Sequence, residues 1–355
     1  MIGRDKREIS GIGAGLWIAN GELPISFFAV KVHSASFVVA VLFAAFALAQ
    51  PSRAQMMVNI DTVTVGDPGN AADTITGYGA VADVFAIGKY EVTISQYTTF
   101  LNAVAATDTY SLYNPFMATD LNIAGITQTG SSGSFSYSVI GSGNRPIAYA
   151  SWFSAARFAN WMNNGATNGA STETGAYTLN GASNGIILKN PGATWFLPSE
   201  DQWYKAAYYK GGGTNAGYYA YATQSDTAPG NIVGGATNQA NHNNGVYSVT
   251  QSAAYSGTQN YLTDAGVFSN SASAYDTFDQ SGNVWEWNDA VSGSSRGLRG
   301  GSWYLLQSSG FGSYVDPTDE DNLVGFRVAT VPEPSTYALL LMTGASTLWF
   351  ARRRR

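Results

Sequence analysis

The stretch FDQSGNVWEWNDA, residues 278–290, brings acidic side chains together in a chain that has few charges. Only 12% of the 355 residues are charged, yet Asp279 and Glu286 lie seven positions apart, with Gly282 between them and a tryptophan on each side of Glu286. Carboxylate oxygens and the backbone carbonyls of such a loop are the hard ligands that calcium prefers. The stretch is therefore a candidate metal-binding loop, with a catalytic loop and a packed turn as the alternatives.

Other catalytic chemistry is limited by the absence of cysteine and the presence of only two histidines. Without cysteine there is no thiolate nucleophile, no thiolate metal ligand and no disulfide. His33 lies in an N-terminal apolar segment, so His242 alone cannot complete an iron site of two or three histidines. No Gly-x-Ser-x-Gly motif precedes a helix to support a serine hydrolase. A carboxylate pair for glycoside cleavage stays open, and its candidates are Glu200, Asp201, Glu286 and Asp289.

The central part of the chain is acidic. Between Gln55 and Thr330 there are nine Lys or Arg residues against twenty Asp or Glu residues, with no basic run. Nucleic-acid binding depends on clustered cations that neutralise phosphates, so we exclude it. Acidic loops rich in Asn and Gly agree better with calcium.

Both ends of the chain have the composition of targeting segments. An apolar run, residues 37–49, is closed by Ser52-Arg53-Ala54, which predicts a secretory signal. At the other end, a Pro-Glu-Pro turn precedes an apolar segment, residues 337–351, and four arginines. This segment can cross a bilayer with the arginines on the cytoplasmic side, so we expect membrane contact through this tail only. The predicted organisation is a signal-containing extension at 1–54, one domain at 55–330 and a tail at 331–355.

Within the central domain, three segments combine a short apolar strand with a helix. In the first, residues 87–105, the helix is capped by Thr93 or Ser95; in the second, residues 145–164, by Ser151 or Ser154. The third is residues 195–210, where acidic residues in the first helical turn and a basic last turn suit the helix dipole. The remaining predictions are strands over 61–84, loops over 107–144 and 211–274, and short strands in the C-terminal third.

Six motifs then occur in a fixed order: PIAYASWFSAARFANWMN, YTLNG, FLPSEDQWYKAAYY, GNVWEW, RGGSW and GFRVA. This series resembles the formylglycine-generating enzyme, or sulfatase-modifying factor, family over nearly all of residues 55–330. The resemblance implies a loop-rich α+β fold, a decorated relative of the C-type lectin fold with little regular secondary structure.

The tail, VPEPS followed by an apolar segment and arginines, resembles the PEP-CTERM sorting signal of Gram-negative bacteria. That resemblance implies export, processing by an exosortase, and release or attachment at the cell surface, often beside exopolysaccharide. The tail would anchor the protein in the inner membrane only transiently.

The family resemblance also implies how the acidic loop works. Carried over by position, calcium would be held by the carboxylates of Asp279 and Glu286 and the carbonyls of Gly282 and Val284. The alternative for Glu286 is a buried ion pair with Arg299 or Arg327. A second calcium site is implied at Asn241 and Asn244, although this segment departs from the family spacing and lacks an Asp.

The same resemblance argues against the family's oxidase chemistry in this chain. Leu305 and Gly310 stand near the positions of the two copper-binding cysteines, so formylglycine formation through copper is excluded, and the missing histidines exclude iron. The family's substrate cleft would be lined by Trp152, Trp303 and Tyr304. We therefore expect a non-catalytic, calcium-stabilised protein that binds polysaccharide or another exported protein. The alternative is an oxidoreductase or carbohydrate-active hydrolase with a different site in the cleft.

Overall fold

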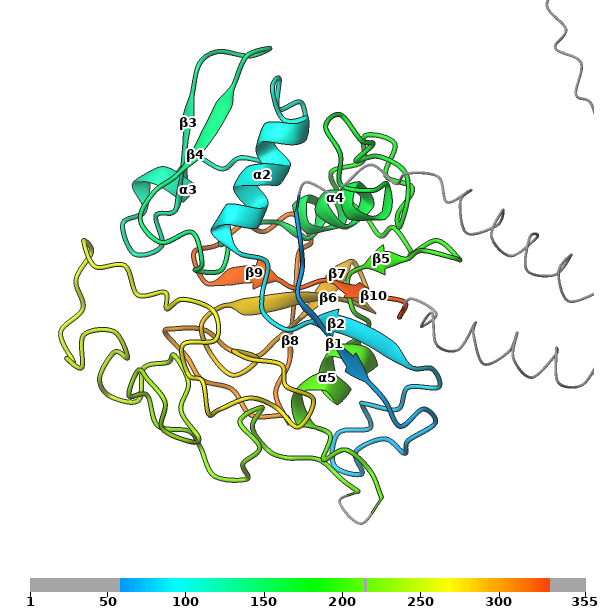
Figure 1. Ribbon diagram of the computed structural model, residues 1–355, viewed down its shortest axis with the longest axis vertical. Coiled ribbons are helices and arrows are strands. Elements are labelled where there is room, and N and C mark those ends of the chain that lie inside the picture. The colour runs from blue at the N-terminus through cyan, green and yellow to red at the C-terminus, as the bar shows by residue number, and fades with distance from the viewer. Residues whose placement is uncertain (1–57, 214–215, 333–355) are drawn as a thin grey trace, which may run out of the picture. The chain divides into compact units, whose positions relative to one another are not determined.

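The computed structural model describes residues 58–213 and 216–332, all of which belong to one compact unit (Figure 1). The secretory signal and the apolar tail segment predicted above lie outside these residues. Within the described part, no helix is long and apolar enough to cross a membrane.

The three long helices begin at side-chain caps. Thr93 caps the first long helix: its hydroxyl accepts from the Gln96 N–H, and the Gln96 side chain accepts from the Thr93 N–H. Ser199 and Gln202 form the same capping box, and Ser151 caps the remaining long helix. Each cap satisfies backbone donors that the first turn leaves free, so the predicted starts at Thr93 and Ser151 are confirmed. The helices are α2 (Ile94–Val104), α3 (Phe116–Thr119), α4 (Trp152–Asn163) and α5 (Glu200–Tyr208).

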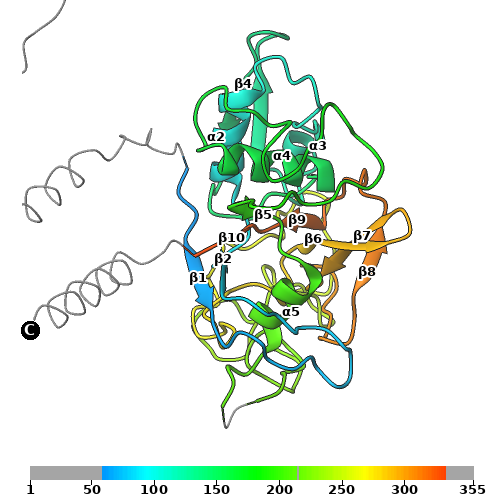
Figure 2. The same cartoon turned by 90° about the vertical axis from the view of Figure 1, so that its right-hand side faces the viewer.

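Short strands form two four-stranded sheets and one hairpin. The first sheet has the order β1-β2-β10-β5, the second β8-β7-β6-β9, and β3 pairs with β4. Their bounds are β1 Thr62–Val65, β2 Phe85–Gly88, β3 Ile126–Thr129, β4 Ser136–Val139, β5 Trp195–Phe196, β6 Trp285–Ser292, β7 Ser295–Arg299, β8 Ser313–Val315, β9 Val324–Phe326 and β10 Ala329–Thr330. Helices α2 and α4 lie on one side of the two four-stranded sheets, and α5 with the long loops lies on the other (Figures 1 and 2). This mixed, loop-rich α+β architecture is the one predicted.

Two sequence predictions of local structure were wrong. Residues 107–144 contain α3 and the β3–β4 hairpin instead of a loop. Each strand of that hairpin buries only one of its four residues, so its sequence lacks the apolar alternation by which strands are recognised. Conversely, residues 61–84 contain only β1, because several of the remaining residues are exposed and form turns.

Aromatic side chains join the helices to the sheets. Tyr97 and Phe100 of α2 pack on Phe158 of α4, and both Tyr97 and Phe158 reach Phe326 of β9. All four are fully buried. The core therefore fixes the end of β9, and with it Arg327, relative to the rest of the domain.

Candidate functional site

The acidic loop has a backbone that few residue types can adopt. Asp279, Gly282 and Asn283 all have positive φ angles, of 62°, 90° and 60°. A Cβ atom on Gly282 would lie 2.2 Å from the carbonyl oxygen of Asn241. Only glycine fits this close approach, so the backbone of the loop is in close contact with the backbone around Asn241.

Asn283 is the centre of the hydrogen bonds that hold this contact. Its N–H donates to the Asn241 carbonyl (2.8 Å), and the Asn241 side chain donates to Asn283 Oδ1 (2.9 Å). The family resemblance implied a second calcium site at Asn241 and Asn244. In the structure Asn241 is buried against the first loop, whereas Asn244 is exposed.

Glu286 is fully buried in an ion pair. Arg327 Nε donates to Glu286 Oε2 (2.5 Å) and Arg327 Nη2 to Oε1 (2.6 Å), while Trp203 Nε1 donates to Oε2 (2.7 Å). This is one of the two ion pairs that the sequence offered as alternatives to calcium. The other does not form, since Arg299 pairs with Glu200.

The other implied calcium ligands retain free oxygens. Asp279 Oδ2 accepts from the Gly266 N–H (2.6 Å), but within the described chain no donor reaches Asp279 Oδ1 or the carbonyls of Gly282 and Val284. Gly282 and Val284 are buried, and a buried carbonyl without a partner is costly. Burial raises the pKa of Asp279 to about 6, against the opposing Gly266 hydrogen bond.

These oxygens fit a calcium ion, provided that the backbone contributes. Among the described residues, no three His, Cys, Asp or Glu side chains converge closely enough to hold a metal alone. Calcium accepts carbonyl oxygens as readily as carboxylates. Asp279, Gly282 and Val284 would supply such oxygens, while Glu286 would share its carboxylate with Arg327.

A third buried carboxylate, Glu91, was not identified from the sequence. It is 1% exposed and comes from the segment between β2 and α2. Its Oε1 accepts from Asn283 Nδ2 (3.2 Å), and its Oε2 has no partner. Burial, and then the charge of Asp279, raise the pKa of Glu91 well above its usual value. The signal available in the sequence was a carboxylate between Tyr90 and Val92, two positions before the helix cap Thr93.

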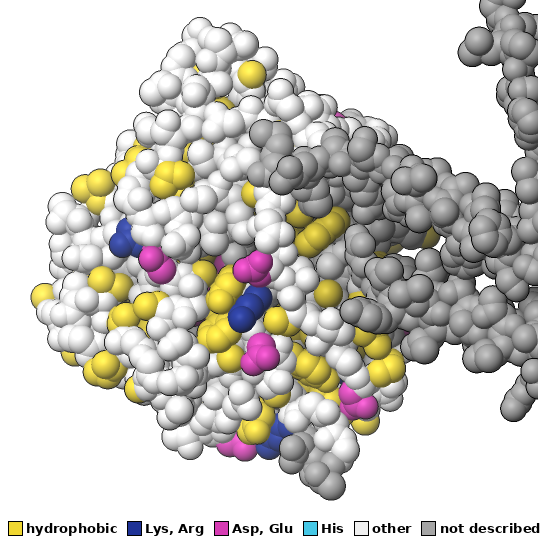
Figure 3. Space-filling model, viewed as in Figure 1, with side chains coloured by type: hydrophobic (Ala, Val, Ile, Leu, Met, Phe, Trp, Pro, Cys, Tyr) yellow, Lys and Arg dark blue, Asp and Glu magenta, His cyan; other side chains and the backbone are white. Residues whose placement is uncertain are grey.

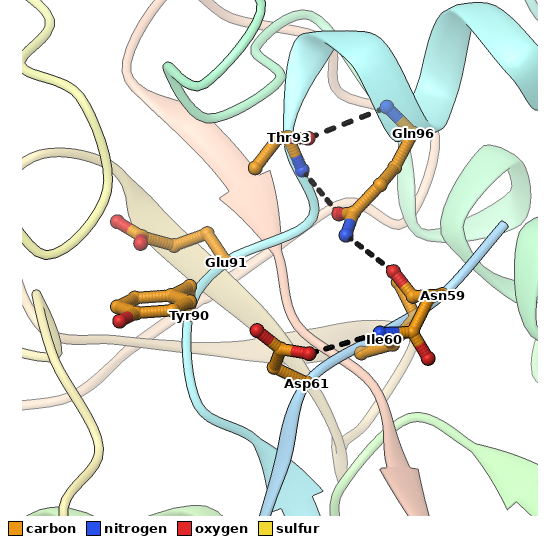
Figure 4. Close-up of a pocket in the computed structure, with 7 residues that line it drawn as sticks. All are labelled: Asn59, Ile60, Asp61, Tyr90, Glu91, Thr93 and Gln96. Atoms are coloured by element: carbon orange, nitrogen blue, oxygen red, sulfur yellow. Dashed lines mark hydrogen bonds between the residues drawn. The ribbon is translucent and has the colours of Figure 1, made fainter.

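A cavity of about 120 Å³ lies beside the backbone of Glu91. It is lined by the N-terminal approach to β1 and by the capping box of α2, and Figure 4 shows the Glu91 side chain pointing away from Asp61 and Gln96. This volume is below that of ordinary small-molecule sites, so we do not assign a ligand to it.

The aromatic residues expected in the cleft have different environments. Trp152 is fully buried under the guanidinium of Arg296, 3.8 Å from its ring centroid, and offers no face to a ligand. Trp303 is only 3% exposed and stacks on Tyr261. Tyr304 is 52% exposed, so it alone of the three can be covered by a ligand directly.

Tyr304 belongs to a larger exposed group, which we call the tyrosine surface. Its members are the exposed Phe116, Tyr255 and Tyr304 and the half-buried Tyr149. Phe116 stacks on Tyr149, which packs against the buried cluster of Tyr247, Tyr261 and Trp303, and Tyr255 and Tyr304 both contact Tyr247. Phe116 and Tyr255 are more than half exposed.

Polar groups bind two members of the tyrosine surface, Tyr149 and Tyr255. Tyr149 Oη and Asn322 Nδ2 both donate to Asp120 Oδ2, at 2.8 and 2.9 Å. Tyr255 Oη donates to Asn122 Oδ1 (2.5 Å). Flat apolar rings beside hydrogen-bonding amides and carboxylates are suited to the faces and hydroxyls of sugars.

Comparison with known proteins identifies the family of the chain and its sorting motif. The model of the sulfatase-modifying factor enzyme 1-like domain matches residues 51–331, and that of the PEP-CTERM protein-sorting motif matches residues 330–355. The chain belongs to the sulfatase-modifying factor family. Its sorting motif implies processing by an exosortase and export to the cell surface or beyond. Among curated proteins, no match to the sequence is found.

Solved structures with a similar arrangement include three proteins of low sequence identity. CarF is 22% identical, with a TM-score of 0.48, over 78% of this chain and 100% of its own. Treponema denticola variable protein 1 is 16% identical (TM-score 0.45; 78% and 96%). PvdO from Pseudomonas aeruginosa is 17% identical (TM-score 0.40; 78% and 93%).

In this member of the sulfatase-modifying factor family, the carboxylates considered for glycoside cleavage all have structural partners. Glu200 accepts from Arg299 Nε and Asn288 Nδ2, and Asp201 from the Gly79 N–H. Asp289 is paired with Arg296 and accepts from Tyr177 Oη. His242 is 2% exposed, with Nε2 at 3.1 Å from the Pro229 carbonyl, and burial lowers its pKa.

Charge on the surface is sparse. On the face drawn in Figure 3, the charged side chains of the described residues occur singly or in small groups of mixed sign. That face does not have the continuous positive potential that a nucleic acid needs.

Proposed function

We propose that this exported protein is a non-catalytic carbohydrate-binding module, with the tyrosine surface as its binding site. The observation that carries this proposal is the exposure of Phe116, Tyr255 and Tyr304 beside Asp120 and polar amides. A monomeric domain rarely leaves such large aromatic rings together in water without a use. Stacked rings bind sugar faces, and the adjoining polar groups accept and donate hydrogen bonds to hydroxyls.

Calcium in the acidic loop would support this surface. The Gly282 N–H donates to the Gly300 carbonyl (2.9 Å), and the Trp303 N–H donates to the Asn283 carbonyl (2.8 Å). The loop therefore positions the segment that presents Tyr304. An ion held by Asp279, Gly282 and Val284, with Glu286, would make that segment rigid, so that less entropy is lost when a ligand binds.

The location of the protein favours polysaccharide as the ligand. The sorting motif implies a place at the cell surface or outside the cell, where glycans are abundant. We also propose that the host is a Gram-negative bacterium and that the tail anchors the protein transiently in its inner membrane. An exported protein is the other candidate partner, and in that case the titration below would show no binding of polysaccharide. No feature of the described residues favours the enzymatic alternative.

Calorimetric titration of the purified protein with the extracellular polysaccharide of its source organism tests the proposal. We expect saturable binding that Tyr304→Ala weakens about tenfold, because truncating a central aromatic contact costs more than about 1 kcal/mol. Tyr314→Ala is the matched control, since Tyr314 is 40% exposed on β8, outside the tyrosine surface. Equal loss in both variants, or no binding by the unaltered protein, would contradict a glycan site here.

A further inference from the structure

The loop Asp279–Glu286 is surrounded by an unequal number of charges. Asp279, Glu286 and Glu91 are each at most 9% exposed, and the cation whose charge acts on both Asp279 and Glu91 is Arg327. With all three carboxylates ionised, these groups and the one guanidinium sum to a charge of minus two. A buried charge without compensation is strongly unfavourable, and one divalent cation would balance this sum.

Glu91 faces this loop rather than solvent or the cavity of Figure 4. Its Oε1 accepts from Asn283 Nδ2. Asn283 lies between Gly282 and Val284, the two residues whose carbonyls lack donors within the described chain. Its Oε2 has no hydrogen-bond partner although the residue is almost completely buried. A carboxylate oxygen in such a place lacks the donors that normally permit burial.

We propose that Glu91 is a third, outer carboxylate of a divalent-cation site at the loop Asp279–Glu286. This inference rests on the calcium part of the proposed function and goes beyond the ligand set that the motif implies. Glu91 acts by its charge across the loop, without touching the ion, because three acidic side chains do not converge on one point in the described structure. In a water-poor interior, a charge still acts strongly over several ångströms.

Replacing Glu91 by Gln should affect the melting temperature without the cation and the affinity for the cation in different ways. Glu91→Gln keeps the shape and an acceptor for Asn283 but removes one negative charge. Without the cation, that change relieves repulsion with Asp279 and Glu286, so the melting temperature should not fall. With the cation, it removes attraction, so the affinity should drop. If Glu91 were only a packing residue, the same change would lower stability equally in both conditions.

The test is a calcium titration of the full chain, monitored by calorimetry and by terbium luminescence. Melting curves are recorded in calcium and in EDTA. We expect Glu91→Gln to raise the Kd for calcium about tenfold or more, since the number of acidic groups tunes calcium affinity, with an EDTA melting temperature at least as high as that of the unaltered protein. Asp83→Asn, which removes one exposed charge elsewhere, should change the Kd less than about twofold. Glu91→Asp, which keeps the charge, should retain more affinity than Glu91→Gln.

Several results would overturn this assignment. An unchanged Kd in Glu91→Gln, a lower melting temperature in EDTA, or failure of this variant to fold would each show that Glu91 is needed for packing and not for charge. Absence of calcium binding by the unaltered protein would remove the site itself. Polysaccharide titration of the same samples measures binding at the tyrosine surface separately. Failure of the glycan site and failure of the cation site can therefore be distinguished.

Discussion

Two kinds of buried charge coexist in this domain, and they differ in their balance. Arg157–Glu173, Arg296–Asp289 and Arg299–Glu200 each join one guanidinium to one carboxylate. Arg327, by contrast, is a single guanidinium that faces three carboxylates, those of Glu286, Asp279 and Glu91. A balanced pair is complete within the protein. The unbalanced group needs either protons or an external cation, so it is the part of the fold where a ligand can control stability.

Replacing the cation of the unbalanced group should have the largest effect. Arg327→Met leaves Glu286 buried without its partner and removes donors from the carbonyls of Gly88 and Phe278. Breaking a buried ion pair costs about 3–5 kcal/mol, and the two other acids raise this value further. Urea unfolding measures the loss. Lys210→Met, in an exposed pair with Asp226, should cost less than about 1 kcal/mol; a similar loss in both variants would refute the contrast.

When the metal is absent, the stability of the unbalanced group should depend on pH through Asp279. The pKa of Asp279 is about 6 in the folded protein and about 4 in an unfolded chain. The folded state therefore binds the proton more tightly, and its stability should fall as pH rises from about 4 to about 6, by up to about 3 kcal/mol.

Urea unfolding in EDTA across this pH range would show that fall, and calcium should remove the part that Asp279 contributes because the ion binds the ionised carboxylate. Asp279→Asn should reduce the slope without removing it, because burial also raises the pKa of Asp289 to about 6. A slope that is the same with and without calcium would separate Asp279 from any cation site.

A smaller effect should come from the backbone of the acidic loop. Gly282→Ala places a methyl group against the Asn241 carbonyl at a positive φ, and we expect a loss of about 2 kcal/mol together with weaker calcium binding. Gly293→Ala also has a positive φ, but a Cβ there meets open space, so it should cost about 1 kcal/mol and leave calcium binding unchanged. Equal calcium affinity in the two variants would show that the shape of the loop is irrelevant to the ion.

Features that depend on neighbouring residues were predictable from the sequence. The caps Thr93 and Ser151 lie within three residues of the N–H groups that they satisfy, so the local pattern is sufficient to place α2 and α4. The six motifs are also short local patterns, and together they indicated the family. The β3–β4 hairpin was missed because its strands bury little, and burial is what gives a strand its recognisable pattern.

Features that depend on distant residues were decided only by the tertiary structure. Glu91 and Asn283 are 192 positions apart, and Trp203 and Glu286 are 83 apart, so no local pattern connects them. Trp152 and Tyr304 were equally good cleft candidates in the sequence, yet packing buries one and exposes the other. The sequence by itself determined where the helices begin, which loop is acidic and that cysteine chemistry is absent. Only folding decided which charges share one interior, because the cost of a buried charge depends on neighbours brought together in space.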